Sequence, residues 1–89
     1  MAKSYVEIEF KEPPKAFYFE RGGEKFFLDS IQKLGWYKSD YQPPIFDIMV
    51  ETEAHDEAEL NYDEWFVVFP DGSGRPYEKS EFELLYKTK

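Results

Sequence analysis

The run EWFVVFP, residues 64–70, limits the fold of this chain more than any other stretch. It is the most apolar segment, and its β-branched and aromatic residues favour an extended strand. Pro70 ends the run because proline has no backbone N–H to donate to a sheet. The Asp-Gly-Ser-Gly that follows contains residues that accept the conformation of a tight turn. We therefore expect residues 64–70 to form the central strand of a sheet.

Three further segments carry the apolar residues of strands. They are YVEIEF (5–10), AFYFE (16–20) and IFDIMVETE (45–53). In the first, apolar and acidic residues alternate with the period of two that a half-buried strand requires. The Pro13-Pro14 pair separates the first two segments, because proline interrupts a ladder of backbone hydrogen bonds. A short strand returns after the turn, at residues 75–77.

The segment RGGEKFFLDSIQKLGW has two interpretations. In one, Gly22-Gly23 is a hairpin turn and KFFL is the returning strand. In the other, a helix begins near Glu24 and ends at Gly35, a residue typical of helix ends. The second interpretation explains the helical spacing of Phe27, Ile31 and Leu34. We expect a helix at about residues 24–34, and leave residues 24–28 open between helix and strand.

The C-terminal segment contains a helix-start pattern. Ser80 is followed by Glu83 three residues later, which is a capping box, and this predicts a helical turn at about residues 81–86. With 89 residues there is room for one domain. The sequence thus predicts a single α+β domain, residues 1–89. It would contain a small antiparallel sheet of four to five strands, one helix and a C-terminal helical turn.

Aromatic side chains supply the bulk that a short chain needs for a core. They make up 20% of the residues, and each large ring buries about 150–250 Å². This is more than a core of this size can hide, so we expect rings both inside and on the surface. Trp36 and Trp65 are expected in the core, and Tyr41 and Tyr62 on the surface.

The charges are unevenly distributed along a chain of net charge −8. Residues 39–74 contain no Lys or Arg, although acidic residues are frequent there. One interpretation is a solvated surface that keeps the protein in solution. The other is a negative surface, with tyrosine anchors, directed at a basic partner. The candidate partner-binding residues are Glu51, Glu53, Asp56, Glu57, Glu59, Asp63, Glu64, Tyr41 and Tyr62.

Several classes of function do not fit this composition. Without cysteine there is no disulfide, thiolate zinc site or cysteine nucleophile. An acidic chain is a poor ligand for nucleic acid or for an acidic membrane surface. Apolar runs are too short for a membrane span or a secretory signal, so we expect a cytoplasmic protein. His55 and the carboxylates near it have no known metal-site spacing. We predict no cofactor, metal or enzymatic activity.

The last quarter of the chain resembles a motif of small phage and prophage proteins of unknown function. In that group, a Gly-Asp-Trp/Tyr-Ile/Val strand is followed by Asp-Gly, a Tyr and a final Phe-x-x-x-Tyr. The matching residues here are Trp65, Val67, Asp71, Gly72, Tyr77, Phe82 and Tyr86. The chain departs from the motif in having NYDEW before the strand and a longer turn. The resemblance implies a phage-type protein that binds and inhibits a host protein.

These observations predict a non-catalytic acidic binding protein. Its partner would be a basic or nucleic-acid-binding host protein. The acidic protein would occlude the basic surface of this partner, and mimicry of DNA or RNA is one form of this mechanism. The alternative is a structural or accessory phage protein that self-assembles through residues 64–69 or 5–10. A third interpretation is the acidic antitoxin of a toxin pair.

Overall fold

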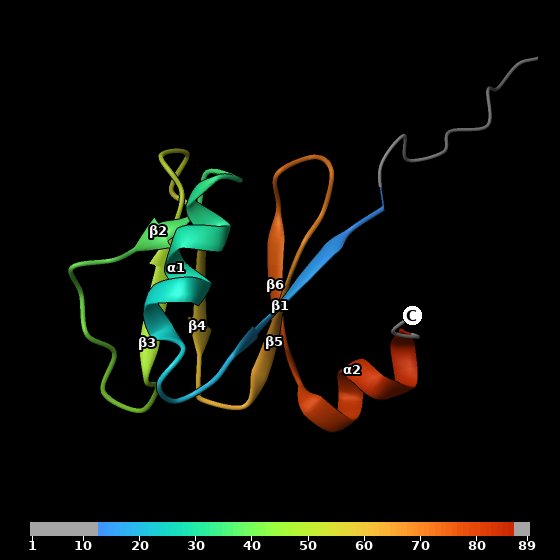
Figure 1. Ribbon diagram of the computed structural model, residues 1–89. Coiled ribbons are helices and arrows are strands. Elements are labelled where there is room, and N and C mark those ends of the chain that lie inside the picture. Colours follow the sequence, from blue (N-terminus) through green and yellow to red (C-terminus); the bar gives the residue numbers. More distant parts are fainter. Residues whose placement is uncertain (1–12, 87–89) are drawn as a thin grey trace, which may run out of the picture.

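The fold is a two-sheet α+β arrangement, seen in a computed structural model that describes residues 13–86 (Figure 1). One antiparallel sheet has the strand order β1-β5-β6 and the other β2-β3-β4. The strands are β1 (Lys15–Phe19), β2 (Tyr37–Lys38), β3 (Ile48–Glu51), β4 (Glu57–Leu60), β5 (Glu64–Val68) and β6 (Gly74–Glu78), and the helices are α1 (Glu24–Gln32) and α2 (Lys79–Leu85). Neither helix of this part of the chain is long and apolar enough to cross a membrane. The strand expected at residues 5–10 lies outside the described residues.

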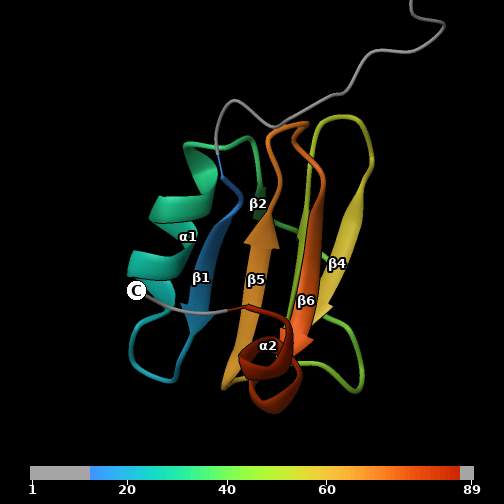
Figure 2. The same cartoon turned by 90° about the vertical axis from the view of Figure 1, so that its right-hand side faces the viewer.

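The α+β class is confirmed, but the strands form two three-stranded sheets rather than one sheet of four to five strands. Strand β4 lies beside β6 without belonging to its sheet (Figures 1 and 2). The physical reason is that the apolar inner face of sheet β1-β5-β6 must be covered, and the apolar inner face of sheet β2-β3-β4 packs against it as a second layer. Strand β5 is central, as expected, and pairs with β1 on one side and β6 on the other.

The main core lies between the two sheets and is closed by α1. Helix α1 contributes Phe27 and Ile31, which confirms the helical interpretation of residues 24–28. The helix ends at Gln32, two residues earlier than expected, and Gly35 follows with a φ of 91°. The core residues are Phe19, Phe27, Ile31, Trp36, Ile48, Val50, Ala58, Leu60, Phe66 and Val68. Trp36 is 1% exposed, so its predicted core position is confirmed.

A second, smaller core lies on the outer face of sheet β1-β5-β6, beneath α2 (Figure 2). Its buried residues are Val67, Tyr77 and Phe82. Trp65 stacks on Phe82 with ring centroids 4.5 Å apart, but it is only half-buried rather than fully in the core. Both faces of the central strand β5 are therefore covered, one by the main core and one by α2.

The capping box expected at Ser80 is not formed. Strand β6 continues to Glu78, and α2 begins directly at Lys79, so that Ser80 lies inside the first turn. Glu78 is the N-cap and makes no side-chain capping bond. Because the strand leads straight into the helix, the residue that begins the helix is set by the end of the strand.

Gly74, the first residue of β6, is where two core rings approach the backbone most closely. A Cβ atom built there would lie 2.8 Å from Cζ2 of Trp36 and still closer to Cζ of Phe66. Both rings are fully buried, so neither can move away without disturbing the core. Glycine is therefore required at this position by the packing of its neighbours.

We predict that Gly74→Ala lowers the free energy of unfolding by about 1–3 kcal/mol, because the added methyl overpacks the core. The matched control is Gly23→Ala, which adds the same methyl at a φ of −109° beside only the movable side chain of Glu20. Urea unfolding followed by tryptophan fluorescence measures both variants. An equal effect of the two substitutions would contradict the packing described here.

Candidate interaction surface

The outward face of sheet β2-β3-β4 carries a group of carboxylates. Val50 of β3 and Ala58 and Leu60 of β4 point into the core. Since side chains alternate along a strand, the residues between and beside them point outward. These outward acids are Glu51, Glu57 and Glu59, and Glu53 and Asp56 follow in the turn that joins β3 to β4. We call these five residues the acidic face.

Two of the strand carboxylates oppose one another directly. Glu51 of β3 is the register partner of Glu57 of β4, which places their Cβ atoms about 4.5–5.5 Å apart. Like charges in this position destabilise a sheet. Among residues 13–86 the one ion pair within 4 Å joins Lys25 and Asp29 of α1, so no internal cation neutralises the pair. The acidic face therefore keeps its charge at a cost to the fold.

The turn between β3 and β4 is held by Thr52. Its Oγ1 accepts a hydrogen bond from the N–H of Asp56 at 3.3 Å, and its carbonyl accepts one from the N–H of His55 at 3.0 Å. His55 has a φ of 69°, a left-handed conformation that is uncommon outside glycine. These bonds fix the tip of the hairpin and expose the side chains of Glu53 and Asp56.

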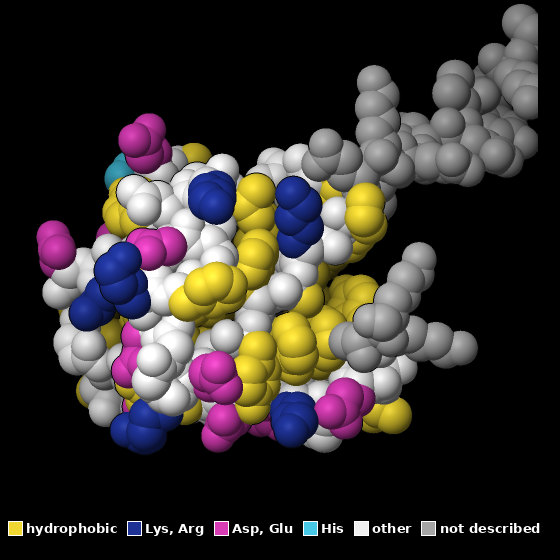
Figure 3. All heavy atoms as spheres, in the orientation of Figure 1, with side chains coloured by type: hydrophobic (Ala, Val, Ile, Leu, Met, Phe, Trp, Pro, Cys, Tyr) yellow, Lys and Arg dark blue, Asp and Glu magenta, His cyan; other side chains and the backbone are white. Residues whose placement is uncertain are grey.

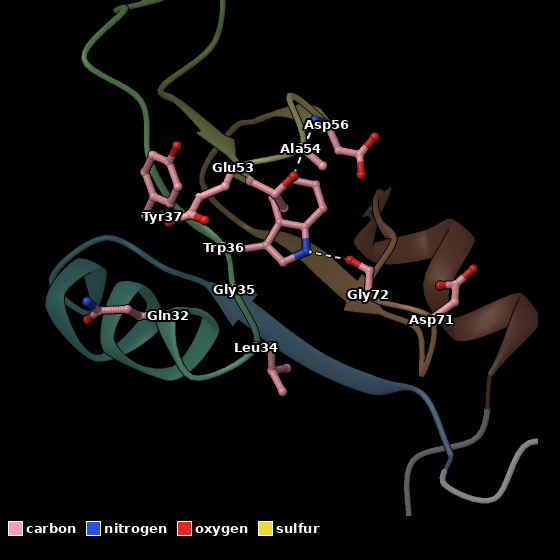
Figure 4. A pocket seen from close by; sticks show the side chains of 11 residues that line it. Gln32, Leu34, Gly35, Trp36, Tyr37, Glu53, Ala54, Asp56, Asp71 and Gly72 are labelled. Carbon is pink, nitrogen blue, oxygen red and sulfur yellow. Dashed lines mark hydrogen bonds between the residues drawn. The ribbon is translucent and has the colours of Figure 1, made fainter.

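A hollow of about 650 Å³ adjoins the tip of this hairpin. The indole N–H of the buried Trp36 donates to the carbonyl of Gly72 at 3.0 Å across this hollow. In Figure 4, Tyr37 and Glu53 lie on one side of the indole, and Asp56 lies on the other. The hollow is lined by Gln32, Leu34, Gly35, Trp36, Tyr37, Thr52, Glu53, Ala54, Asp56, Asp71 and Gly72. The acidic face thus continues onto a concave surface.

Asp71 adds a further fixed carboxylate at the edge of the hollow. Its Oδ1 accepts hydrogen bonds from the hydroxyl and the backbone N–H of Ser73, at 2.6 and 2.9 Å. The hydroxyl bond, followed by the backbone bond, lowers the pKa of Asp71 below its ordinary value. A carboxylate held in this way remains charged and points in one direction.

Tyr37 is a surface residue of this site that the sequence did not single out. It is the register partner of Glu51, lies beside the acidic face and is 41% exposed. The sequence does contain a signal for it. Trp36 directly precedes β2, and neighbouring side chains of an extended segment point to opposite faces, so a buried Trp36 implies an outward Tyr37.

Three of the predicted partner-binding residues lie at the other end of β4, away from the hairpin tip. Asp63 accepts a hydrogen bond from the hydroxyl of Tyr18 at 2.9 Å, and this bond raises the pKa of Tyr18. Glu64 accepts one from the N–H of Asn61 at 2.6 Å. The structure therefore gives Asp63 and Glu64 internal partners in the β4–β5 turn.

Tyr62, the third, packs against the body of the protein. Its ring stacks on Phe19 with centroids 4.8 Å apart, and the guanidinium of Arg21 lies 4.3 Å from its centroid on the ring face. Its hydroxyl donates to Glu24 at 3.0 Å. Tyr41, by contrast, is 58% exposed in the connection between β2 and β3, so its expected surface position is confirmed.

The described residues contain no group of three His, Cys, Asp or Glu side chains that could hold a metal ion. His55 and the carboxylates beside it are spread over both strands and the turn of the hairpin, which separates their side chains. What the acidic face offers chemically is a dense negative charge beside an exposed tyrosine.

The chain matches no protein-family model, and no curated protein or solved structure matches it.

We predict that Glu51→Gln raises the free energy of unfolding by about 0.2–1 kcal/mol, because it removes one of two opposed charges. The matched control is Glu59→Gln on the same face, since Glu59 faces the apolar Met49 rather than another acid. Urea unfolding at low salt measures the difference. Salt should reduce it by screening the charges, and a loss of stability in Glu51→Gln would contradict the repulsion.

The Tyr62–Glu24 hydrogen bond predicts a pH dependence. The pKa of Glu24 is lowered, first by its own backbone N–H and then by the Tyr62 hydroxyl. A lowered carboxyl pKa contributes stability that is present above the ordinary pKa and is lost as pH falls through the folded value. Tyr62→Phe should therefore lower the free energy of unfolding at neutral pH. The difference in stability between this variant and the wild type should become smaller as the pH falls.

Thermal unfolding measured from neutral pH to below the ordinary pKa of a glutamate, about 4.3, tests this effect. Tyr41→Phe is the control, because it removes a hydroxyl that makes no hydrogen bond to the described residues. A constant offset between wild type and Tyr62→Phe at every pH would show that the hydroxyl does not stabilise ionised Glu24.

Proposed function

We propose that this protein is a non-catalytic binding protein whose acidic face docks on a basic surface of another protein and blocks it. The observation that carries the proposal is the direct opposition of Glu51 and Glu57 on an outward sheet face, where neither carboxylate has an ion-pair partner within 4 Å among residues 13–86. A sheet surface selected only for stability would pair these positions with opposite charges or with β-branched residues. A partner that supplies cations would remove the repulsion on binding.

The shape of the site supports a protein partner with arginine or lysine side chains. Tyr37 borders the acidic face, and an arginine that pairs with Glu51 could place its guanidinium on this ring. The carboxylates would also steer a basic partner during encounter, because long-range attraction raises association rates. The hollow beside the hairpin tip would receive side chains that project from such a surface.

A nucleic-acid-handling protein is the class of partner that fits this chemistry. Glu57 and Glu59 repeat on one face of β4, and alternate residues of a strand lie about 6.8 Å apart. The two carboxylates therefore form a short row of negative charge, which supports mimicry of neighbouring phosphates on a nucleic-acid strand. Because the C-terminal motif resembles that of phage and prophage proteins, the partner would be a protein of the host cell.

Self-assembly through EWFVVF, the alternative interpretation, has little support in the fold. Strand β5 is paired on both edges and covered on both faces. A second copy could not pair with it unless β1 or β6 were displaced.

The test compares two triple variants that change the net charge equally. The acidic-face variant is E53Q/E57Q/E59Q, and the control, on β6 and α2, is E78Q/E81Q/E83Q. Each is used as bait in a host lysate at low and high salt, and captured proteins are identified by mass spectrometry. The captured partner is then purified, and its nucleic-acid binding is measured with and without each variant.

We expect the wild type and the control variant to capture the same nucleic-acid-binding protein and to inhibit its nucleic-acid binding. The acidic-face variant should bind at least about 10-fold more weakly, a loss of about 1.4 kcal/mol spread over three charges. Equal weakening by both variants would mean that net charge alone is responsible. Undiminished binding by the acidic-face variant would refute the proposed surface.

A further inference from the structure

Strand β1 has an open edge next to helix α1. Within the described residues it pairs with β5 alone, so its other edge has no strand beside it. Two hollows of about 290 and 210 Å³ follow this edge and share Phe17 and Ser30 in their walls. Together they form one groove between β1 and α1. Figure 3 shows a band of hydrophobic side chains on this side of the molecule, with basic side chains near its upper end.

The groove is apolar along its length and charged at its ends. Phe17 and Phe27 line it, and Phe26 at its rim is 79% exposed, which is unusual for so large an apolar side chain. Lys15 and Lys33 lie at one end, where β1 begins, and Glu20 at the other. An open edge with apolar walls favours the addition of another strand.

The segment YVEIEF, residues 5–10, matches this groove in pattern and in charge. Val6, Ile8 and Phe10 alternate with two glutamates. Four residues, 11–14, join this segment to β1, which is the length of a hairpin loop. Glu12, in this connection, would then lie at the end of the groove that carries Lys15 and Lys33, and Lys3 at the end that carries Glu20.

The prolines select one pairing register. Residues that are directly opposite each other in two paired strands point to the same side of the sheet. Val6, Ile8 and Phe10 can therefore reach the apolar groove only if they are opposite residues that point inward, such as Phe17 and Phe19. A two-residue loop at Pro13-Pro14 would need positive φ angles, which proline cannot adopt. A six-residue loop would leave Phe10 outside the pairing. The four-residue loop places Ile8 opposite Phe17 and Glu9 opposite Ala16.

We propose that residues 5–10 of the chain itself fill the groove as a strand added antiparallel to β1. The added strand would extend the sheet to four strands and cover Phe17 and the exposed Phe26. It would also close an edge that otherwise invites pairing with other chains. The inference does not depend on the proposed function, because the groove and the acidic face lie on different sheets.

A disulfide test suits this protein because the chain has no cysteine. In the full chain, E9C/A16C joins two positions that the proposal places opposite each other, with Cβ atoms about 4.5–5.5 Å apart. The control, E9C/E20C, keeps the same first cysteine but moves the second to the far end of β1. Both variants leave Val6, Ile8 and Phe10 of the segment and Phe17 and Phe26 of the groove unchanged. Circular dichroism checks that each is folded.

We expect an intrachain disulfide in E9C/A16C to form at least about 10-fold faster than in E9C/E20C, because docking raises the effective concentration of one pair alone. A segment that does not dock would close both loops at rates within about two-fold, since closure depends weakly on loop length. Similar rates, or no disulfide in either variant, would overturn the proposal. Disulfide-linked dimers of E9C/A16C would also overturn it, and would assign the groove to a second copy of the chain.

Discussion

The rest of the structure depends on one contact, which joins Trp36 to the turn and the strands of the opposite sheet. The two sheets share no ladder of hydrogen bonds, so side chains must join them. The ring of Trp36 packs edge-on against Phe66 at 4.9 Å, and its N–H donates to the carbonyl of Gly72. Gly74 leaves the space that both rings occupy. Because Trp36 directly precedes β2, this contact also sets the position of the β2-β3-β4 sheet and of its acidic hairpin.

Two sets of acidic residues in the described part of the chain differ in their hydrogen bonds. Asp63, Glu64, Glu24 and Asp71 accept bonds from a tyrosine, an amide or a serine, and these bonds hold turns and the start of a helix in place. The acidic face has no comparable partners for its side chains in the described part of the chain. A net stability of about 5–15 kcal/mol is typical of a domain, so a domain stays folded despite a repulsion of a few tenths of a kcal/mol. One set of carboxylates therefore holds the fold together through hydrogen bonds, and the acidic face does not.

The sequence predicted the elements better than their assembly. Alternation and helical spacing identified β1, β3, β5 and α1, because these patterns depend on which face of an element is buried. The division into two sheets could not be predicted, since it results from how rings distant in sequence fill one core. For the same reason Tyr62 was expected at the surface, although its ring stacks on Phe19 and its hydroxyl reaches Glu24. The sequence did single out the five acids of the acidic face as partner-binding candidates, but it could not show that they lie on one hairpin or separate them from Asp63 and Glu64, which follow within a few residues.

The arrangement of the two sheets determines how the charge of the acidic face can be changed without loss of the fold. Sheet β1-β5-β6 is covered on both faces and holds most of the large rings, so its substitutions act mainly on stability. Sheet β2-β3-β4 uses small and aliphatic residues inside, and its outward positions in β4 make no packing contacts with the core. Charge on β4 can therefore vary with little effect on packing. Substitutions can therefore change the charge of a surface on β4 without disturbing the core, whereas substitutions on β5 would change the packing of the core.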